Sequence, residues 1–233
     1  MVNLTFLYKY VIIYLNTDKK YIKGKSVMNN IPRHKVFISY YHHDDQLYKD
    51  KLLDANRNYN LFEDYSVHEK EIKDNNLSNE TIRKIIRDEY MQDATVLILL
   101  CGKNTKRRKH IDWEIHTAMF DTPLNPKMGI LAINLPLSEN NQRSCSQEDK
   151  QYFSPYINWT AIGYSRAEIE REYPDMPSRI AENFEKEDVK ISVVNWETIE
   201  EDFSRLKGLI HNAFQRRKNN NYDHSTPLRR NNS

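Results

Sequence analysis

The stretch RKHIDWEIHTAM, which runs from Arg108 to Met119, contains an acidic residue that is a candidate for catalysis. The residue is Glu114, and its immediate neighbours are the apolar Trp113 and Ile115. A carboxylate placed in this way can stabilise positive charge that develops on a substrate. The alternative is an ordinary acid near the start of a helix, where the helix dipole favours negative charge.

Polar and aromatic side chains occur where three apolar segments end, at residues 40–45, 64–71 and 102–109. We predict that these segments are strands of one parallel sheet, and that a helix containing Glu114 follows the third. In open sheets of parallel strands, ligands bind beyond the carboxyl ends of the strands. The three loops and Glu114 are therefore expected to meet at one edge of the sheet.

Apolar runs typical of strands alternate along the chain with patterns typical of helices. Strands are expected at 35–40, 59–66, 94–102, 129–136 and 189–196, and helices at 44–57, 78–91, 109–120 and 200–217. The run at 94–102 is apolar almost throughout, as in strands that are buried on both faces of a parallel sheet. This order predicts an α/β fold, a flavodoxin-like doubly wound parallel sheet of about five strands.

The first residues of two helices are also predicted. Asp44 is expected to cap the helix at 44–57 and to place Leu47, Leu52 and Leu53 against the core. Ser78 or Asn79 is expected to cap the next helix, whose apolar face consists of Ile82, Ile85 and Ile86.

One main domain is expected at residues 35–217, because the alternation of strands and helices extends over that range. The segment at about 138–177 interrupts the alternation and is predicted to be an insertion that packs on the domain through its aromatic residues, Tyr152, Phe153, Tyr156, Trp159 and Tyr164. Residues 1–34 are expected to form an N-terminal extension, and the tail at 218–233, rich in Asn and Arg, is expected to be disordered.

Composition argues against several classes of protein. The formal net charge is +2, with basic residues spread among nearly as many acids, so no nucleic-acid partner is expected. The apolar run at 6–15 is interrupted by Lys9 and is shorter than the roughly 20 residues that span a bilayer, so no membrane anchor is predicted. Cys101 and Cys145 lie far apart in the sequence, which favours a reducing, cytoplasmic compartment over a disulfide framework.

The sequence contains neither the glycine-rich motifs that bind phosphates nor the HExxH and GxSxG patterns of hydrolases. His42, His43, Asp44 and Asp45 have the side chains of metal ligands. Adjacent residues at a strand end point in different directions, however, and acids at a helix start are explained as cap and first-turn charges. No metal site is predicted.

Four stretches in order along the chain carry a family resemblance: FISYYHHDD at 37–45, IRDEYMQDATVLILLCG at 86–102, RKHIDWEI at 108–115 and GILAINLP at 129–136. They resemble the TIR-like family that includes the ThsB proteins of Thoeris anti-phage systems. The stretches NWETIEEDF and HNAFQRR nearer the C-terminus match more loosely. In many enzymatic TIR domains a catalytic glutamate follows a tryptophan by four positions. Here Glu114 occupies the glutamate position and His110 the tryptophan position.

The resemblance implies cleavage of the bond between nicotinamide and ribose in NAD, with Glu114 as the catalytic residue and NAD as substrate rather than cofactor. Candidates to hold the nucleotide by stacking and hydrogen bonding are Tyr40, Tyr41, His42, Asp64, Ser66 and Trp113. The resemblance further implies that the product, a cyclic or conjugated ADP-ribose derivative, is a signal to an effector protein. A phage component would trigger the activity by driving assembly into a homo-oligomer.

Two other functions are compatible with the same topology. One is a non-catalytic interaction module, since many TIR domains only assemble with other TIR domains. The other is a receiver-like phosphoacceptor domain, which needs an acid pair after the first strand and a lysine after the last. Asp44 and Asp45 supply the acid pair, but the stretch VVNWE at 193–197 contains no lysine.

A second methionine, Met28, lies shortly before the first expected strand at 35–40. We predict that a chain beginning at Met28 folds and keeps its activity, because residues 35–40 supply the first strand without help from the upstream segment. Soluble yield and activity of the two chains test this expectation. Loss of soluble protein in the shorter chain, or membrane association of the full chain alone, would contradict it.

Overall fold

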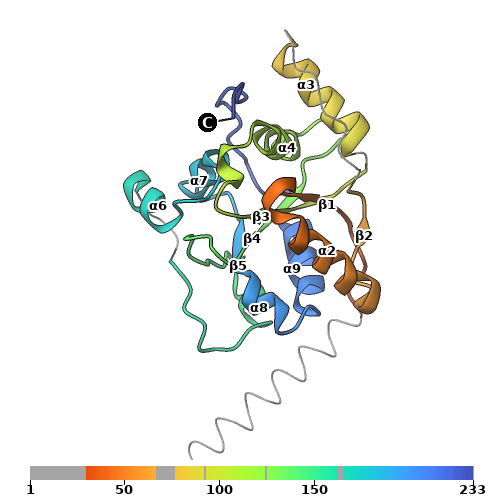
Figure 1. Ribbon diagram of the computed structural model, residues 1–233, viewed down its shortest axis with the longest axis vertical. Helices are drawn as coiled ribbons and strands as arrows, with labels where there is room; N and C mark the ends of the chain where they lie inside the picture. The colour runs from red at the N-terminus through yellow and green to blue at the C-terminus, as the bar shows by residue number, and fades with distance from the viewer. Residues whose placement is uncertain (1–29, 67–76, 92, 124, 162–164, 233) are drawn as a thin grey trace, which may run out of the picture.

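The computed structural model describes residues 30–66, 77–91, 93–123, 125–161 and 165–232 (Figure 1). Five parallel strands form one sheet in the order β2-β1-β3-β4-β5. The strands are β1 (Lys35–Ser39), β2 (Glu63–Asp64), β3 (Val96–Cys101), β4 (Gly129–Asn134) and β5 (Ser192–Asn195). This topology confirms the predicted flavodoxin-like α/β fold. The predicted extension falls mostly outside the described residues, as does Met28.

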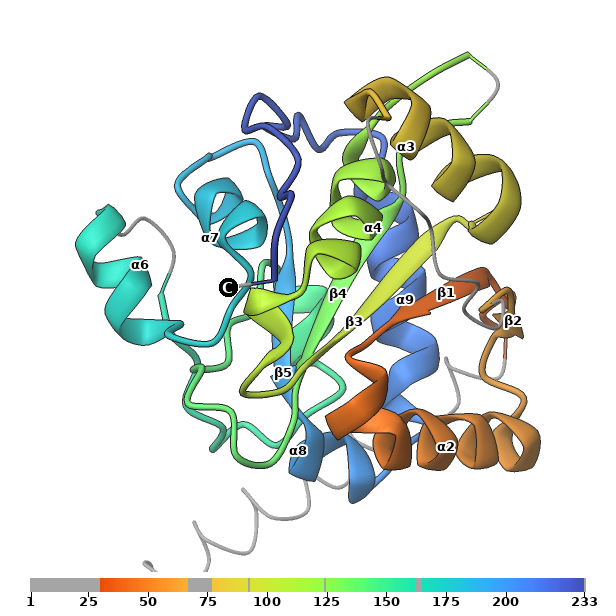
Figure 2. The same ribbon diagram turned by 45° about the horizontal axis from the view of Figure 1, so that its top comes forward.

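Helices cover both faces of the sheet (Figures 1 and 2). One face, called here the α4 face, carries α3 (Asn79–Ile85), the π-helical turn η1 (Ile86–Tyr90), α4 (Lys109–Met119) and α7 (Ser178–Phe184), with α6 (Arg166–Glu172) beside α7. The other, called the α9 face, carries α2 (His42–Tyr59), α8 (Trp196–Glu200) and α9 (Arg205–Arg216). Successive side chains of a strand point to opposite faces, so β1, β3, β4 and β5 each contribute to both of the two hydrophobic clusters.

The alternation along β1 decides where the polar residues at its end are directed. Phe37 belongs to the cluster on the α4 face, whereas Val36, Ile38 and Tyr40 belong to the cluster on the α9 face. Tyr41 packs against the α4-face cluster. Ser39, two residues after Phe37, also points towards α4.

Several predicted boundaries differ from the structure. Helix α2 begins at His42 and is preceded by Tyr41 at the cap position, so Asp44 is a first-turn acid rather than the cap. Leu47 is 60% exposed and does not face the core. Ser78 does cap α3, since its hydroxyl accepts a hydrogen bond from the Thr81 N–H at 3.1 Å. The second strand keeps only two residues because the Ser66 hydroxyl, at 2.9 Å, accepts the Ile38 N–H where the ladder would continue.

The predicted insertion packs partly through its aromatic residues. It includes a short helix, α5 (Gln147–Lys150), and Arg143, which forms an isolated antiparallel β-bridge with Val193 of β5. Tyr152 and Phe153 are buried, and Trp159 packs edge-on against Phe153 with ring centroids 5.2 Å apart. Tyr156 is exposed instead, and Tyr164 lies outside the described residues.

The C-terminal segment 218–232 is packed on the domain, in contrast to the disorder predicted for it. Tyr222 and Leu228 are buried in the α4-face cluster. The Tyr222 hydroxyl also donates a hydrogen bond to the Met128 carbonyl at 3.1 Å. In the sequence these two side chains are surrounded by polar residues. No periodic apolar pattern therefore predicts their burial, which arises from tertiary contacts. Within the described ranges, no helix has the length and apolar character needed to cross a bilayer.

A histidine pair, of which His34 is buried and His211 partly exposed, links the start of β1 to α9. The His34 ring lies 4.0 Å from the Phe214 ring, and its Nε2 is 2.9 Å from Nδ1 of His211. Burial, together with the smaller effects of the neighbouring His211 and Arg217, lowers the pKa of His34 from 6.5 to about 4.

We predict that the protein loses stability as the pH falls from about 6.5 to about 4. Over that range the unfolded chain binds a proton at residue 34 that the folded chain excludes, and protons therefore favour unfolding. His34→Phe keeps an aromatic ring and should flatten the dependence of melting temperature on pH. His43→Asn, at an exposed position, is the control and should leave the dependence unchanged. An identical pH profile for wild type and His34→Phe would refute the assignment.

Candidate active site

Glu114 lies in the second turn of α4, which begins at Lys109. The acid in the first turn is Asp112, so interaction with the helix dipole does not account for Glu114. The Glu114 side chain is partly exposed, and its Oε2 accepts a hydrogen bond of 2.6 Å from the Ser39 hydroxyl. Ser39 is buried at the end of β1. A carboxylate on a helix is thereby oriented by the end of a central strand.

Tyr41 lies on the same face of the sheet as Ser39 and Glu114. The Arg108 guanidinium stacks over its ring, 3.7 Å from the ring centroid. Arg108 is also the residue that precedes the first turn of α4. The stack therefore connects the end of β1 to the start of the helix that carries Glu114, and it places an aromatic ring and a cation on the α4 face.

Tyr40 and His42 are directed away from Glu114. Tyr40 is buried in the α9-face cluster, and its hydroxyl donates to Gln46 Oε1 at 2.7 Å. The same hydroxyl lies 3.2 Å from His42 Nδ1. The prediction that these two residues join Tyr41 at one nucleotide site does not agree with this geometry, because consecutive residues at a strand end alternate between the two faces.

Asp64 and Ser66 form a turn at the end of β2, beside β1. The Ser66 N–H donates to Asp64 Oδ1 at 2.9 Å, while the Ser66 hydroxyl accepts from the backbone of Ile38. Asp64 is exposed and Ser66 is partly exposed. Both residues therefore lie at the carboxyl edge of the sheet, next to the end of β1, where the sequence predicted them.

Trp113 cannot stack on a ligand, in contrast to its predicted role, because its side chain is fully buried. Its indole N–H donates to the carbonyl of Arg229 at 2.7 Å. The His110 ring packs edge-on against it, with centroids 4.9 Å apart. Trp113 thus holds the C-terminal segment against α4, and this role has no signal in the local sequence.

A buried ion pair holds the opposite side of α4. Arg179, on α7, donates from Nε and Nη2 to the two oxygens of Asp112, at 2.9 and 3.1 Å. The same guanidinium donates to the carbonyls of Thr226 and Pro227. The Arg229 N–H donates to Asp112 at 2.9 Å. Sequence reasoning missed this network, since Arg179 lies on a helix that it did not predict.

Two carboxylates of α4 therefore have different chemistry. Asp112 is neutralised by a bidentate arginine and also accepts the Arg229 N–H, whereas Glu114 accepts from a neutral hydroxyl and has partial access to solvent. The two are two positions apart on a helix of 3.6 residues per turn, so they project to nearly opposite sides. Of the two, only Glu114 has the access and the orientation that a catalytic carboxylate needs.

Residues 37–140 match the model of the family described as "Thoeris protein ThsB, TIR-like domain". The matched segment contains Ser39, Tyr41, Ser66 and Glu114, and it ends before α7 and the C-terminal segment. No curated protein matches the chain.

The Asp112–Arg179 pair yields a prediction about stability. Arg179→Met leaves a buried carboxylate without its cation and should lower the free energy of unfolding by about 3–5 kcal/mol. Urea denaturation measures the change. The control is Lys51→Met, which removes a 2.7 Å ion pair to Glu200 whose partners are each 43% exposed, and should cost less than about 1 kcal/mol. Equal losses in the two variants would show that the buried pair has no special role.

Proposed function

We propose that the protein cleaves NAD between nicotinamide and ribose, on the ground that residues 37–140 match the TIR-like domain of the Thoeris ThsB family. The observation that carries the proposal is the Glu114 carboxylate, partly exposed and oriented by the Ser39 hydroxyl at 2.6 Å. The product, a cyclic or conjugated ADP-ribose derivative, would serve as a signal to an effector protein in defence against phage.

A single carboxylate is sufficient for this reaction. Glycosidases that act on neutral sugars use two, because the leaving oxygen must be protonated. Nicotinamide leaves NAD from a cationic ring: the bond from the ribose carbon to the ring nitrogen breaks, and its electron pair neutralises the nicotinamide. Positive charge then develops on the ribose, and a preorganised carboxylate stabilises it. Water or another hydroxyl captures the cation and releases a proton.

Three of the candidate binding residues remain part of this proposal: Tyr41, Asp64 and Ser66. Tyr41 offers an aromatic face already paired with the Arg108 guanidinium, which suits a base or a phosphate. Asp64 and Ser66 offer polar groups beyond the carboxyl end of β2. Tyr40, His42 and Trp113 are left out, because their contacts or burial direct them elsewhere.

Assembly is part of the proposed mechanism. Tyr41 and Glu114 are both partly exposed, so a second copy of the chain can complete the site around a bound nucleotide. A phage component would favour this association. The alternative function, a non-catalytic module that only assembles with other TIR domains, shares the assembly step but makes no use of the Glu114 charge.

We predict that Glu114→Gln lowers nicotinamide release from NAD by about a hundredfold or more, measured at high protein concentration with phage lysate present. The amide keeps the size of the side chain and accepts the Ser39 hydrogen bond, but it removes the charge. The melting temperature should hardly change. Glu89→Gln, at an exposed position on η1, is the matched control and should keep full activity.

The Ser39 contact supplies a second arm of the same experiment. Ser39→Ala removes a hydrogen bond to a charged group and should lower activity by roughly tenfold, while Ser39→Thr restores the hydroxyl and most of the activity. Wild-type activity in Glu114→Gln would rule out the enzymatic function and favour the interaction module.

A further inference from the structure

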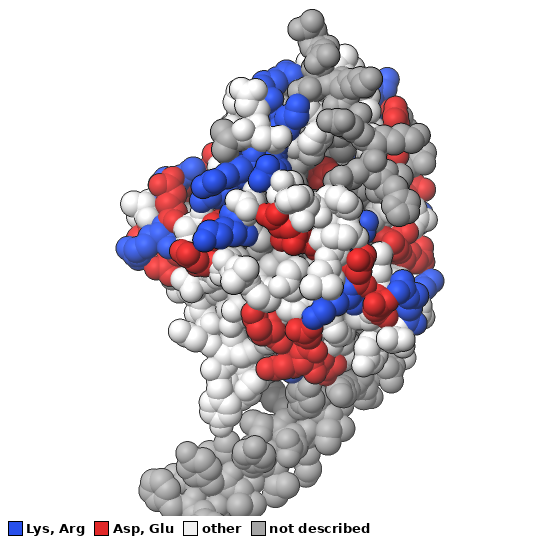
Figure 3. Space-filling view, viewed as in Figure 1, with Lys and Arg blue, Asp and Glu red and all other residues white. Residues whose placement is uncertain are grey.

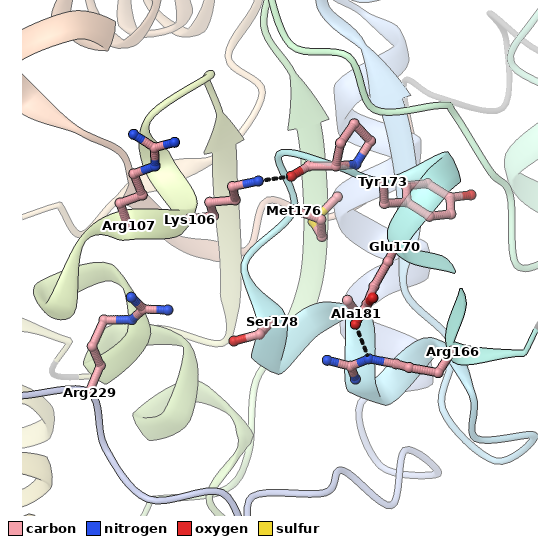
Figure 4. Close-up of a pocket in the computed structure, with 10 residues that line it drawn as sticks. Lys106, Arg107, Arg166, Glu170, Tyr173, Met176, Ser178, Ala181 and Arg229 are labelled. Atoms are coloured by element: carbon pink, nitrogen blue, oxygen red, sulfur yellow. Dashed lines mark hydrogen bonds and ion pairs between the residues drawn. The ribbon is translucent and has the colours of Figure 1, made fainter. Parts of the chain in front are cut away.

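A pocket of about 410 Å³ lies between the loop that leads into α4, helices α6 and α7, and the C-terminal segment (Figure 4). Its size is in the range of sites that hold a small molecule of nucleotide dimensions. Its charged lining residues are Lys106, Arg107, Arg166, Arg229 and Glu170. Basic groups therefore predominate in a concave site that the proposed NAD chemistry does not use.

The basic groups converge on the pocket from separate parts of the chain. Lys106 and Arg107 come from the 3₁₀ turn η2 (Thr105–Arg107), Arg166 from α6 and Arg229 from the C-terminal segment. Figure 4 shows the first two and Arg229 on one side of the pocket and Arg166 on the other. In Figure 3 blue side chains gather beside α7 and the segment that leads into α4.

Contacts within the lining hold part of this arrangement in place. Lys106 donates from Nζ to the Pro174 carbonyl. Arg166 donates from Nε to Glu170 at 2.7 Å, and its other nitrogens lie 3.7 and 3.6 Å from Glu182 and Glu185. These acids offset the charge of Arg166. Arg107 is exposed and Arg229 is partly exposed, so an anion entering the pocket can reach both guanidinium groups.

The pocket is distinct from the Glu114 site. Asp112 and Glu114 project to opposite sides of α4, and Asp112 is bound by α7 and by the backbone of Arg229, which lines the pocket. Glu114 instead contacts β1. None of the residues considered above for nucleotide binding or catalysis is among the lining residues of this pocket.

We propose that this pocket binds a phosphate-bearing small molecule at a site separate from Glu114. The guanidinium groups of Arg107 and Arg229 match the oxygens of a phosphate, to which arginine donates paired hydrogen bonds. Pro174, Met176 and Ala181 add apolar surface to the lining, against which the organic part of the ligand packs. The ligand is a free phosphate ester rather than a lipid headgroup, since the pocket has nucleotide-like dimensions.

Isothermal titration of the full chain with AMP tests the proposal. The Glu114→Gln protein is used beside the unaltered one, so that the result does not depend on NAD cleavage. AMP should bind both proteins equally, and at least about tenfold more tightly than adenosine, because the phosphate supplies the charge-assisted contacts. Failure of the Glu114 activity prediction would leave this experiment unaffected.

Substitutions localise the binding. Arg107→Gln should weaken AMP binding at least about threefold, with its melting temperature unchanged, and the double variant Arg107→Gln with Arg229→Gln should weaken it at least about tenfold. Arg171→Gln is the matched control: it lies on α6, outside the pocket lining, and should bind AMP as the wild type does. Absence of AMP binding, or equal affinity in Arg107→Gln and Arg171→Gln, would overturn the proposal. Capture by phosphatidic acid vesicles without binding of AMP would overturn it as well.

Discussion

The buried ion pair between Asp112 and Arg179 determines how α4 sits in this protein. It joins α4 to α7, and through the same guanidinium and carboxylate it joins both helices to the C-terminal segment. A buried pair of this kind adds little net stability over an apolar substitute, because both charges lose their hydration. Its main effect is to fix the orientation of α4. Arg179 holds Asp112 on one side of the helix, and the opposite side, which carries Glu114, therefore faces β1.

The two sides of α4 consequently present different chemistry. Glu114 projects towards the end of β1, where Ser39 orients it and where solvent still reaches it. On the other side lies the basic pocket, one wall of which is the C-terminal segment that Asp112 and Trp113 hold. The Glu114 carboxylate suits the ribosyl cation of the proposed reaction, and the clustered guanidiniums suit the phosphate of the proposed ligand.

Much of the fold follows from patterns that a single sequence contains. The apolar runs of β1, β3, β4 and β5 and the helical patterns between them predicted a doubly wound sheet, and Ser78 was one of the two residues predicted as the cap of α3. The exceptions have local physical causes. Leu47 is exposed because it lies five positions before the buried Leu52, about 140° away around a helix of 3.6 residues per turn. Strand β2 is short because the Ser66 hydroxyl replaces a strand partner.

The candidate site shows the same division between local pattern and tertiary contact. The sequence by itself determined that Glu114 lies on a helix after a central buried strand, because periodicity and element order depend only on nearby residues. Only the tertiary structure decided that Tyr41 accompanies it while Tyr40 does not, and that Trp113 is buried beneath the C-terminal segment. Arg179 reaches Asp112 across 67 positions of sequence. No local pattern encodes such a contact, because it exists only when two separate helices pack together.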